Sequence, residues 1–170
     1  MTKASPSPPG IEKTRRTFHI VASRFNTQYV DGLIAHVAEE LRALVPHGTI
    51  LVHRVPGSFE IPVVAREVAI QNKADAIIAC GVILQGETDH AQNLSRSVTD
   101  ALQRIAIEHG MPVINVVLSF DNENQARARC LENKINRGTE AARAAVEIAN
   151  VLSEVRGTRS GGFETAEDNG

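Results

Sequence analysis

The feature that most constrains the fold of this chain is an apolar run near its middle, residues 75–84. Both alternating faces of the run carry apolar side chains, in the order Asp-Ala-Ile-Ile-Ala-Cys-Gly-Val-Ile-Leu. This pattern is typical of a central strand in a parallel sheet that helices cover on both faces. Shorter apolar runs at 18–22, 50–55 and 113–118 predict three further strands. The chain is therefore expected to fold around a buried sheet.

Helical patterns separate these strands. In the first, apolar residues recur at helical spacing, at Val30, Leu33, Ile34, Val37, Leu41 and Leu44. Further helices are expected from Ser58, as N-cap, towards Ile70, from 91 to 105, after an Asn122–Gln125 capping box, and from about Thr139 to Val155. Because strands and helices alternate, the predicted fold class is α/β, with right-handed βαβ units in a doubly wound parallel sheet.

Length and composition favour one domain with two tails. Residues 17–156 carry the strand and helix patterns, whereas the Pro-rich residues 1–16 and the Gly- and acid-rich residues 157–170 are expected to be disordered. A net charge of −2 without basic stripes gives no reason to expect nucleic acid or an anionic membrane as partner. No apolar segment is long enough to span a bilayer and no secretory signal is evident, so we expect a cytoplasmic protein.

Cysteine and most histidine residues give no sign of a metal or redox site. Cys80 and Cys130 lack metal-type spacing and are expected to be reduced structural thiols. Four histidines have no clustered partners, so no metal is expected: His36, His47, His53 and His109. The chain also lacks the GxGxxG and GxxxxGK[ST] patterns of dinucleotide and P-loop sites.

Polar motifs follow all four predicted strands, and such exits meet at one edge of a parallel sheet, where ligands bind. The motifs lie at 24–26, 57–60, 86–90 and 119–122. At 86–90 the chain enters a helix, whose free first-turn N–H groups favour an anion such as phosphate, with Thr88 or Asp89 as cap. His90 stands at this mouth, and imidazole is suited to proton transfer near neutral pH.

Each of these residues also has a simpler interpretation. His90 alone could be a helix-cap histidine, and Phe25 and Phe59 could be core aromatics. Glu60 and Arg129 could be solvated surface charges that make weak pairs. The pattern at the strand exits favours the site, but each single residue leaves both interpretations open.

Six short pieces, in order and near-family spacing from about Phe18 to Leu152, together resemble one enzyme family. They are Ser23-Arg-Phe-Asn26, Val55-Pro-Gly-Ser-Phe-Glu-Ile-Pro62, Gly81 through His90, Pro112-Val-Ile114, Gln125-Ala126 with Arg129, and Asn136-Arg-Gly138. The family is 6,7-dimethyl-8-ribityllumazine synthase, of riboflavin biosynthesis. The resemblance implies a flavodoxin-like three-layer αβα sandwich with a four-stranded parallel sheet in the order 2-1-3-4. It also implies condensation of 5-amino-6-(D-ribitylamino)uracil with L-3,4-dihydroxy-2-butanone 4-phosphate to the lumazine, phosphate and water, without metal or organic cofactor.

The resemblance assigns roles residue by residue. His90 matches the catalytic histidine. The ring and ribityl chain are assigned to Phe25, Asn26, Ser58, Phe59, Glu60, Val82, Ile83, Leu84, Asn115 and Arg137, with Glu140 a further polar position. The phosphate is assigned to Gly86, Glu87, Thr88 and Arg129, with the arginine supplied by an adjacent subunit. An arginine fork suits phosphate in a way that lysine cannot copy.

The resemblance also implies a homopentamer with active sites between subunits, and some relatives form sixty-subunit shells. A Pro-rich N-terminal segment cannot readily add a strand to a neighbour, so we expect a free pentamer. Three departures bear on function: Ala91-Gln-Asn93 replaces aromatics after the histidine, Asn115 stands where relatives often have Phe, and Glu87 adds negative charge near the phosphate. The first two motivate an alternative, a non-catalytic lumazine- or flavin-binding protein of the same fold. A third candidate, an archaeal-type riboflavin synthase, is disfavoured because its dismutation has no phosphate to hold.

Overall fold

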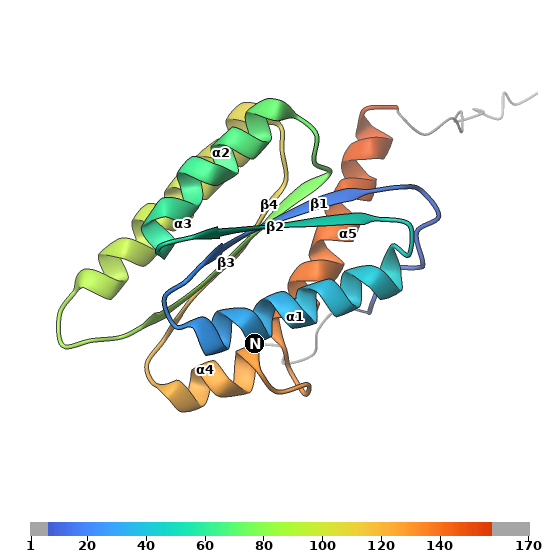
Figure 1. The fold of residues 1–170 in the computed structure, drawn as a ribbon. Helices are drawn as coiled ribbons and strands as arrows, with labels where there is room; N and C mark the ends of the chain where they lie inside the picture. Colours follow the sequence, from blue (N-terminus) through green and yellow to red (C-terminus); the bar gives the residue numbers. More distant parts are fainter. Residues whose placement is uncertain (1–6, 158–170) are drawn as a thin grey trace, which may run out of the picture.

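Strands and helices alternate along the chain, as the sequence predicts (Figure 1). The computed structural model describes residues 7–157 of the 170. In chain order the elements are β1 (Thr17–Ser23), α1 (Thr27–Leu44), β2 (Thr49–Val55), the short 3₁₀ turn η1 (Ser58–Glu60), α2 (Ile61–Gln71), β3 (Ala76–Leu84), α3 (His90–His109), β4 (Val113–Phe120), α4 (Glu123–Cys130) and α5 (Arg137–Val155).

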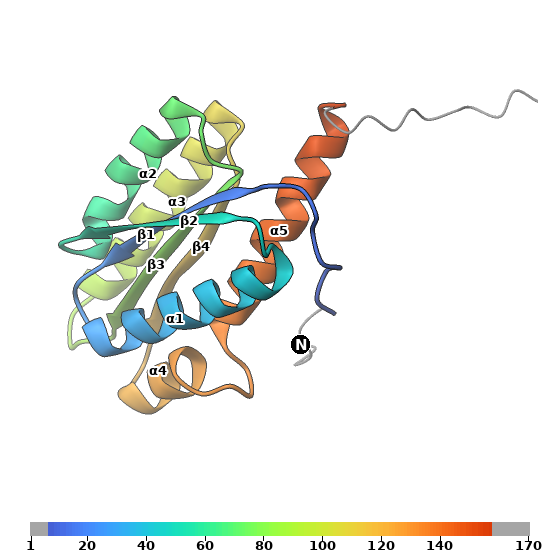
Figure 2. The same cartoon turned by 45° about the vertical axis from the view of Figure 1, so that its right-hand side comes forward.

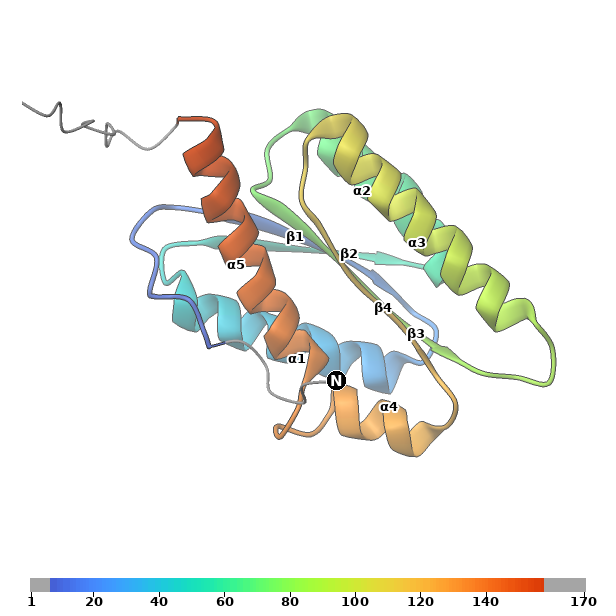
Figure 3. The ribbon, with the colours of Figure 1, turned by 180° about the vertical axis from the view of Figure 1, so that it is seen from behind.

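The strands form one parallel sheet in the order β2-β1-β3-β4, which confirms the predicted topology. Helices α2 and α3 cover one face, and α1, α4 and α5 lie on the other (Figures 1 and 2). The view from behind shows the same three layers, with α5 crossing the sheet beside α1 (Figure 3). The predicted αβα sandwich is therefore present.

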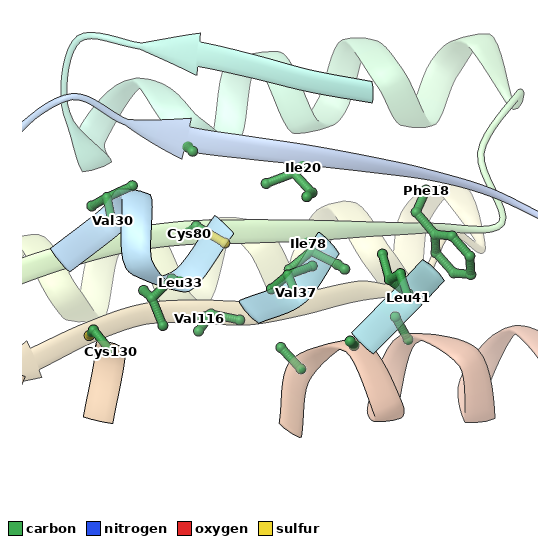
Figure 4. Packing of buried hydrophobic residues seen from close by; sticks show 14 of the residues in the cluster. Phe18, Ile20, Val30, Leu33, Val37, Leu41, Ile78, Cys80, Val116 and Cys130 are labelled. Carbon is green, nitrogen blue, oxygen red and sulfur yellow. The ribbon is translucent and has the colours of Figure 1, made fainter. Parts of the chain in front are cut away.

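A separate hydrophobic core fills the space on each side of the sheet. The core under α1 and α5 holds Phe18, Ile20, Ile78 and Cys80 among its fully buried side chains (Figure 4). The core under α2 and α3 includes Val21, Ile77 and Ala79 from the same strands, together with Ile61, Ala65, Val98 and Leu102 from the helices. Because β1 and β3 supply side chains to both cores, they form the rigid centre from which the exit loops start.

Both cysteines are buried in the α1–α5 core and are reduced, as predicted. Burial is the main reason why the pKa of each thiol is raised to about 12. Figure 4 shows Cys80 on β3 and Cys130 at the end of α4. Their environment fits a packing role and keeps the thiols protonated near neutral pH.

Helix starts agree only partly with the predicted caps. Ser58 is not an N-cap: the N-cap position of α2 is Glu60, and Ser58 lies inside η1. Pro62 does lie in the first turn of α2. The Asn122 cap is confirmed, because its Oδ1 accepts a bond of 3.0 Å from the backbone N–H of Gln125.

The predicted tails lie largely outside the described residues, which exclude 1–6 and 158–170. Residues 7–16 form neither helix nor strand, but they contact the domain: the N–H of Glu12 donates to the carbonyl of Leu44 at 2.7 Å. Arg16 is buried and donates to Asp75 at 3.2 Å. Within residues 7–157 no helix is long and apolar enough to span a membrane.

Candidate functional site

The exit of β1 is joined to the end of β3 by one side chain. Asn26, in the left-handed conformation with φ 54°, follows the exposed ring of Phe25. Its Nδ2 donates to the carbonyl of Val82 at 2.7 Å. Asparagine tolerates this backbone conformation better than most residues. The sequence therefore places an exposed aromatic face, 70% accessible, on a turn that a hydrogen bond fixes to the sheet.

The exit of β2 lies directly beside this turn. The N–H of Arg24 donates to the carbonyl of Val55 at 2.9 Å, which joins the two exits. Glu60 turns back so that its Oε2 accepts from the N–H of Gly57 at 2.8 Å. A Cβ placed on Gly57 would lie 3.2 Å from the ring of Phe25 and 3.0 Å from Glu60 Oε2. Glycine thus allows the Phe25 ring and the Glu60 carboxylate to meet over the backbone.

Four of the predicted ring-site residues turn largely inward instead. Ser58 is buried, and its Oγ lies against Gly81 of β3. Val82 packs in the α1–α5 core, Ile83 in the α2–α3 core, and Leu84 is partly buried against the α1–α5 core. These side chains support the site from below, so any contact of theirs with a ligand would come mainly through the backbone. Phe59, in contrast, is 66% exposed.

The loop between β3 and α3 carries the predicted phosphate and catalytic residues. Gly86, Glu87, Thr88 and His90 are all exposed, and a Cβ on Gly86 would meet nothing within 4 Å. Asp89 is the N-cap residue of α3, but its side chain makes no capping hydrogen bond. The first-turn N–H groups of α3 are thus left without a side-chain cap beside the exposed imidazole of His90.

Arg129 lies on the opposite side of the sheet from His90. It is half-buried on α4, below the face that α1 and α5 cover, whereas His90 begins α3 on the other face (Figures 1 and 3). Within residues 7–157 Arg129 makes no hydrogen bond or ion pair. It lines an open cavity of about 660 Å³ together with Phe120, Asn124, Gln125, Ala128, Glu132, Lys134 and Ile135. No residue of the 86–90 loop lines this cavity.

Two further predicted site residues, Arg137 and Asn115, do not lie at the edge where the strands end. Arg137 is in an ion pair with Glu140, three residues along α5. Asn115 lies within β4 rather than at its end, and its amide donates to Thr99 of α3 at 3.2 Å while its Oδ1 accepts from the N–H of Val117. Both side chains thus make contacts within their own subunit.

Sequence reasoning missed three features. Lys134 shares the cavity of Arg129, which its place in an irregular segment between helices did not indicate. Gln85 donates to Ser119 at 2.9 Å and joins the exits of β3 and β4. His53 does have a partner: its Nε2 lies 2.9 Å from Nδ1 of His19, a contact that only strand register reveals. Groups of three or more residues able to hold a metal are absent from the described residues.

A family model described as 6,7-dimethyl-8-ribityllumazine synthase matches residues 15–153 of the chain. The chain belongs to this family. Proteins of that name are similar over most of their length. The one from Azoarcus sp. (strain BH72) is 40% identical over 78% of this chain and 83% of its own. Those from Paraburkholderia phymatum and Nitrosospira multiformis are 39% and 34% identical over 84% of this chain, and over 81% and 88% of their own.

The family match covers every strand and nearly all of α5, so it includes both parts of the candidate site. The exits of β1 and β2 form one connected group, and the loop 86–90 with His90 lies beside them at the same edge of the sheet. Arg129 and Lys134 form a second group on another side of the molecule. The roles of the individual residues remain predictions.

Proposed function

We propose that this chain catalyses the condensation of 5-amino-6-(D-ribitylamino)uracil with L-3,4-dihydroxy-2-butanone 4-phosphate to 6,7-dimethyl-8-ribityllumazine, a transferase reaction of riboflavin biosynthesis. The observation that carries the proposal is the family match over residues 15–153. The exposed groups at the sheet edge support it. A flat heterocycle needs an aromatic face, a sugar alcohol needs acceptors, and a phosphate needs N–H groups.

In this proposal the β1 and β2 exits bind the uracil substrate. The exposed ring of Phe25 stacks on the pyrimidine. Glu60 uses one carboxylate oxygen to hold the N–H of Gly57, so the other oxygen accepts hydrogen bonds from ribityl hydroxyls. Phe59 and backbone groups of η1 contribute further contacts. This arrangement fixes the amino group of the substrate next to the 86–90 loop.

The 86–90 loop binds the second substrate and moves protons. The uncapped N–H groups at the start of α3 donate hydrogen bonds to the phosphate, helped by Thr88 and the backbone of Gly86. His90 removes a proton from the attacking amine and returns one to the departing hydroxyl as the imine forms. It serves again in phosphate elimination and ring closure. Glu87 is exposed, and the proposal requires its carboxylate to point away from the phosphate, because a like charge there would weaken binding.

We further propose a homopentamer in which Arg129 of one subunit completes the phosphate site of its neighbour. Two observations support this. Arg129 has no partner within residues 7–157 and lies apart from His90 in its own chain. Phe59 and Val63, 66% and 67% exposed, present apolar surface beside the sheet edge that a neighbouring subunit would cover. Asn115 and Arg137 would contact the substrate only across such an interface. A cytoplasmic location stays a prediction from the sequence.

The proposed reaction is tested by mixing the purified protein with both substrates and following the lumazine absorbance against the uncatalysed condensation. We expect acceleration that falls roughly 10²- to 10⁴-fold in His90→Ala. His47→Ala, which removes another exposed histidine far from the sheet edge, is the matched control and should keep full activity. A folded protein that binds the lumazine tightly without accelerating the reaction would instead support the binding-protein alternative.

The shared site is tested by subunit mixing. With the butanone phosphate kept far below the raised KM of the Arg129 variant, His90→Ala and Arg129→Ala should each be nearly inactive alone. If one site takes His90 and Arg129 from different subunits, about one quarter of the sites in randomly mixed rings are intact, and activity returns. Mixtures that stay as inactive as their parents would place both residues in one chain. Sedimentation at the mass of five subunits, rather than sixty, is the expected assembly state.

A further inference from the structure

Two histidines face each other on adjacent strands, away from the strand exits. Nδ1 of His19 on β1 lies 2.9 Å from Nε2 of His53 on β2. The rings are nearly parallel, with an interplanar angle of 22° and centroids 5.1 Å apart. The reaction proposed above uses neither residue. The pair therefore needs its own explanation.

The strand register places both imidazoles on one face of the sheet. Val21 pairs with His53, and His19 pairs with Leu51. Side chains alternate along a strand, so these four residues share the face that α2 and α3 cover, the face to which Val21 and Val55 belong. Because β2 is the edge strand, the pair is only partly buried, and Leu51 beside it is 42% exposed. Both imidazoles are thus partly exposed to solvent.

We propose that His19 and His53 form a two-histidine binding site for a divalent transition metal ion, with water in the remaining coordination positions. Imidazole nitrogen is a preferred ligand of Ni²⁺, Cu²⁺ and Zn²⁺. The two donors come from strands already fixed by backbone pairing, so the chelate closes without ordering a loop.

The printed contact shows what a metal ion would have to change. With the nitrogens 2.9 Å apart and the ring centroids 5.1 Å apart, the two rings meet nearly head-on, as in an N–H···N hydrogen bond. Binding of one ion by both nitrogens requires each ring to turn so that the two lone pairs converge on the ion, at metal–nitrogen distances of about 2.05 Å. Ni²⁺, Cu²⁺ and Zn²⁺ all bind imidazole, and we expect Cu²⁺ to bind most tightly, as it does at nitrogen sites in general.

The proton balance of the pair is compatible with binding. In the neutral pair one of the two facing nitrogens carries the proton and the other accepts it. A metal ion needs both as lone-pair donors, so that proton moves to the other nitrogen of the same ring.

The test uses tag-free protein and NiCl₂ in isothermal titration calorimetry, with CuSO₄ and ZnCl₂ for comparison. We expect saturable binding of one Ni²⁺ per chain. His19→Gln and His53→Gln should each weaken it at least roughly tenfold, because the second nitrogen binds within the same chelate. His47→Gln, a lone exposed histidine, should leave the affinity unchanged. Circular dichroism and urea denaturation report whether the two Gln variants are folded.

A second measurement needs no substitution. Ni²⁺ should protect His19 and His53 of the wild-type protein from diethylpyrocarbonate, while His47 continues to react. Absence of saturable binding, equal affinity in the Gln variants, or protection of other histidines alone would overturn the proposal. None of these results depends on whether the chain makes lumazine, so the site and the proposed reaction can fail separately.

Discussion

The β1–β2 exits (residues 24–26 and 57–60) and the β3–α3 loop (residues 86–90) lie at the same edge of the sheet, but the chain holds them differently. The exits are joined to each other by the Arg24–Val55 hydrogen bond and to β3 by the Asn26–Val82 hydrogen bond, and a Glu60–Gly57 hydrogen bond stabilises the second exit internally. In the loop, four of the proposed site residues are exposed, and the helix that follows has no side-chain cap.

This difference teaches how the two substrates would be handled. The exits are preorganised by contacts within one subunit, which suits a large rigid heterocycle whose orientation decides the reaction. The loop leaves its N–H groups and His90 free, which suits a small charged substrate that supplies its own contacts. The missing cation would come from α4 of another subunit. The following predictions test whether the exits are preorganised within one subunit and whether the 86–90 loop needs a residue from another subunit.

Among the residues proposed to bind substrate, the largest effect should come from Arg129, which in the proposed ring of subunits completes the phosphate site. Arg129→Ala should raise the KM for the butanone phosphate roughly 10- to 100-fold, because charged hydrogen bonds to the phosphate are lost. The KM for the uracil substrate should hardly change. Arg129→Lys should recover only part of the loss, since an ammonium cannot make the forked contact. Steady-state kinetics with each substrate varied in turn measures both values.

Arg127→Ala is the matched control for this prediction. Arg127 lies on the same helix two residues away, is exposed and lines no part of the cavity. Its removal should leave both KM values unchanged. Equal increases for the two variants would mean that α4 contributes only general positive charge.

A smaller effect is expected at Gly57, on the preorganised side. In Gly57→Ala the new methyl group would lie 3.2 Å from the Phe25 ring and 3.0 Å from Glu60 Oε2. The ring and carboxylate must move by a few tenths of an ångström, so the KM for the uracil substrate should rise roughly three- to tenfold. Gly10→Ala, where a Cβ meets nothing within 4 Å, should have no effect. An unchanged KM in Gly57→Ala would show that the exits tolerate adjustment.

The sequence predicts the sheet well because the positions of its strands depend on apolar patterns. A strand with apolar residues on both faces, such as 75–84, has few places other than the centre of a sheet, and the family resemblance supplies the strand order. Exit loops are also predictable in kind, since glycine and polar residues must end each strand.

Side-chain direction was harder to predict. Ser58 was expected at a helix cap but turns inward onto Gly81, and Val82 and Ile83 enter the two cores. The pattern of residues at the end of a strand does not show which side chains are buried in the core and which face the site. The His19–His53 contact depends on register, which joins residues 34 positions apart. Lys134 joins Arg129 only because the segment after α4 folds back along it.

Asn26 offers a stability test of how firmly the exits are held. Asn26→Ala should lower the free energy of unfolding by about 2 kcal/mol, through the left-handed backbone and the lost bond to Val82. Asn72 is the matched control: it has φ 50°, and its side chain makes no hydrogen bond within the described chain. Asn72→Ala should cost about 1 kcal/mol, for the backbone alone. Urea denaturation measures both, and equal losses would mean that the bond to Val82 contributes nothing.

The smallest effect is expected from the two cysteines, which report on the opening of the sheet below the exits and of helix α4. Cys80 lies on β3 below the exits, and Cys130 ends α4 beside Arg129. With each thiol pKa raised to about 12, roughly one thiol in 10⁴ is ionised at pH 8, and both are buried. Iodoacetamide should therefore modify neither in the native protein and both in guanidinium chloride. If α4 opens locally while the sheet stays intact, Cys130 reacts before Cys80 as denaturant is added. Equal rates for the two thiols at every concentration would show that α4 opens only when the whole domain unfolds, and that the Arg129 side is as firmly held as the exits.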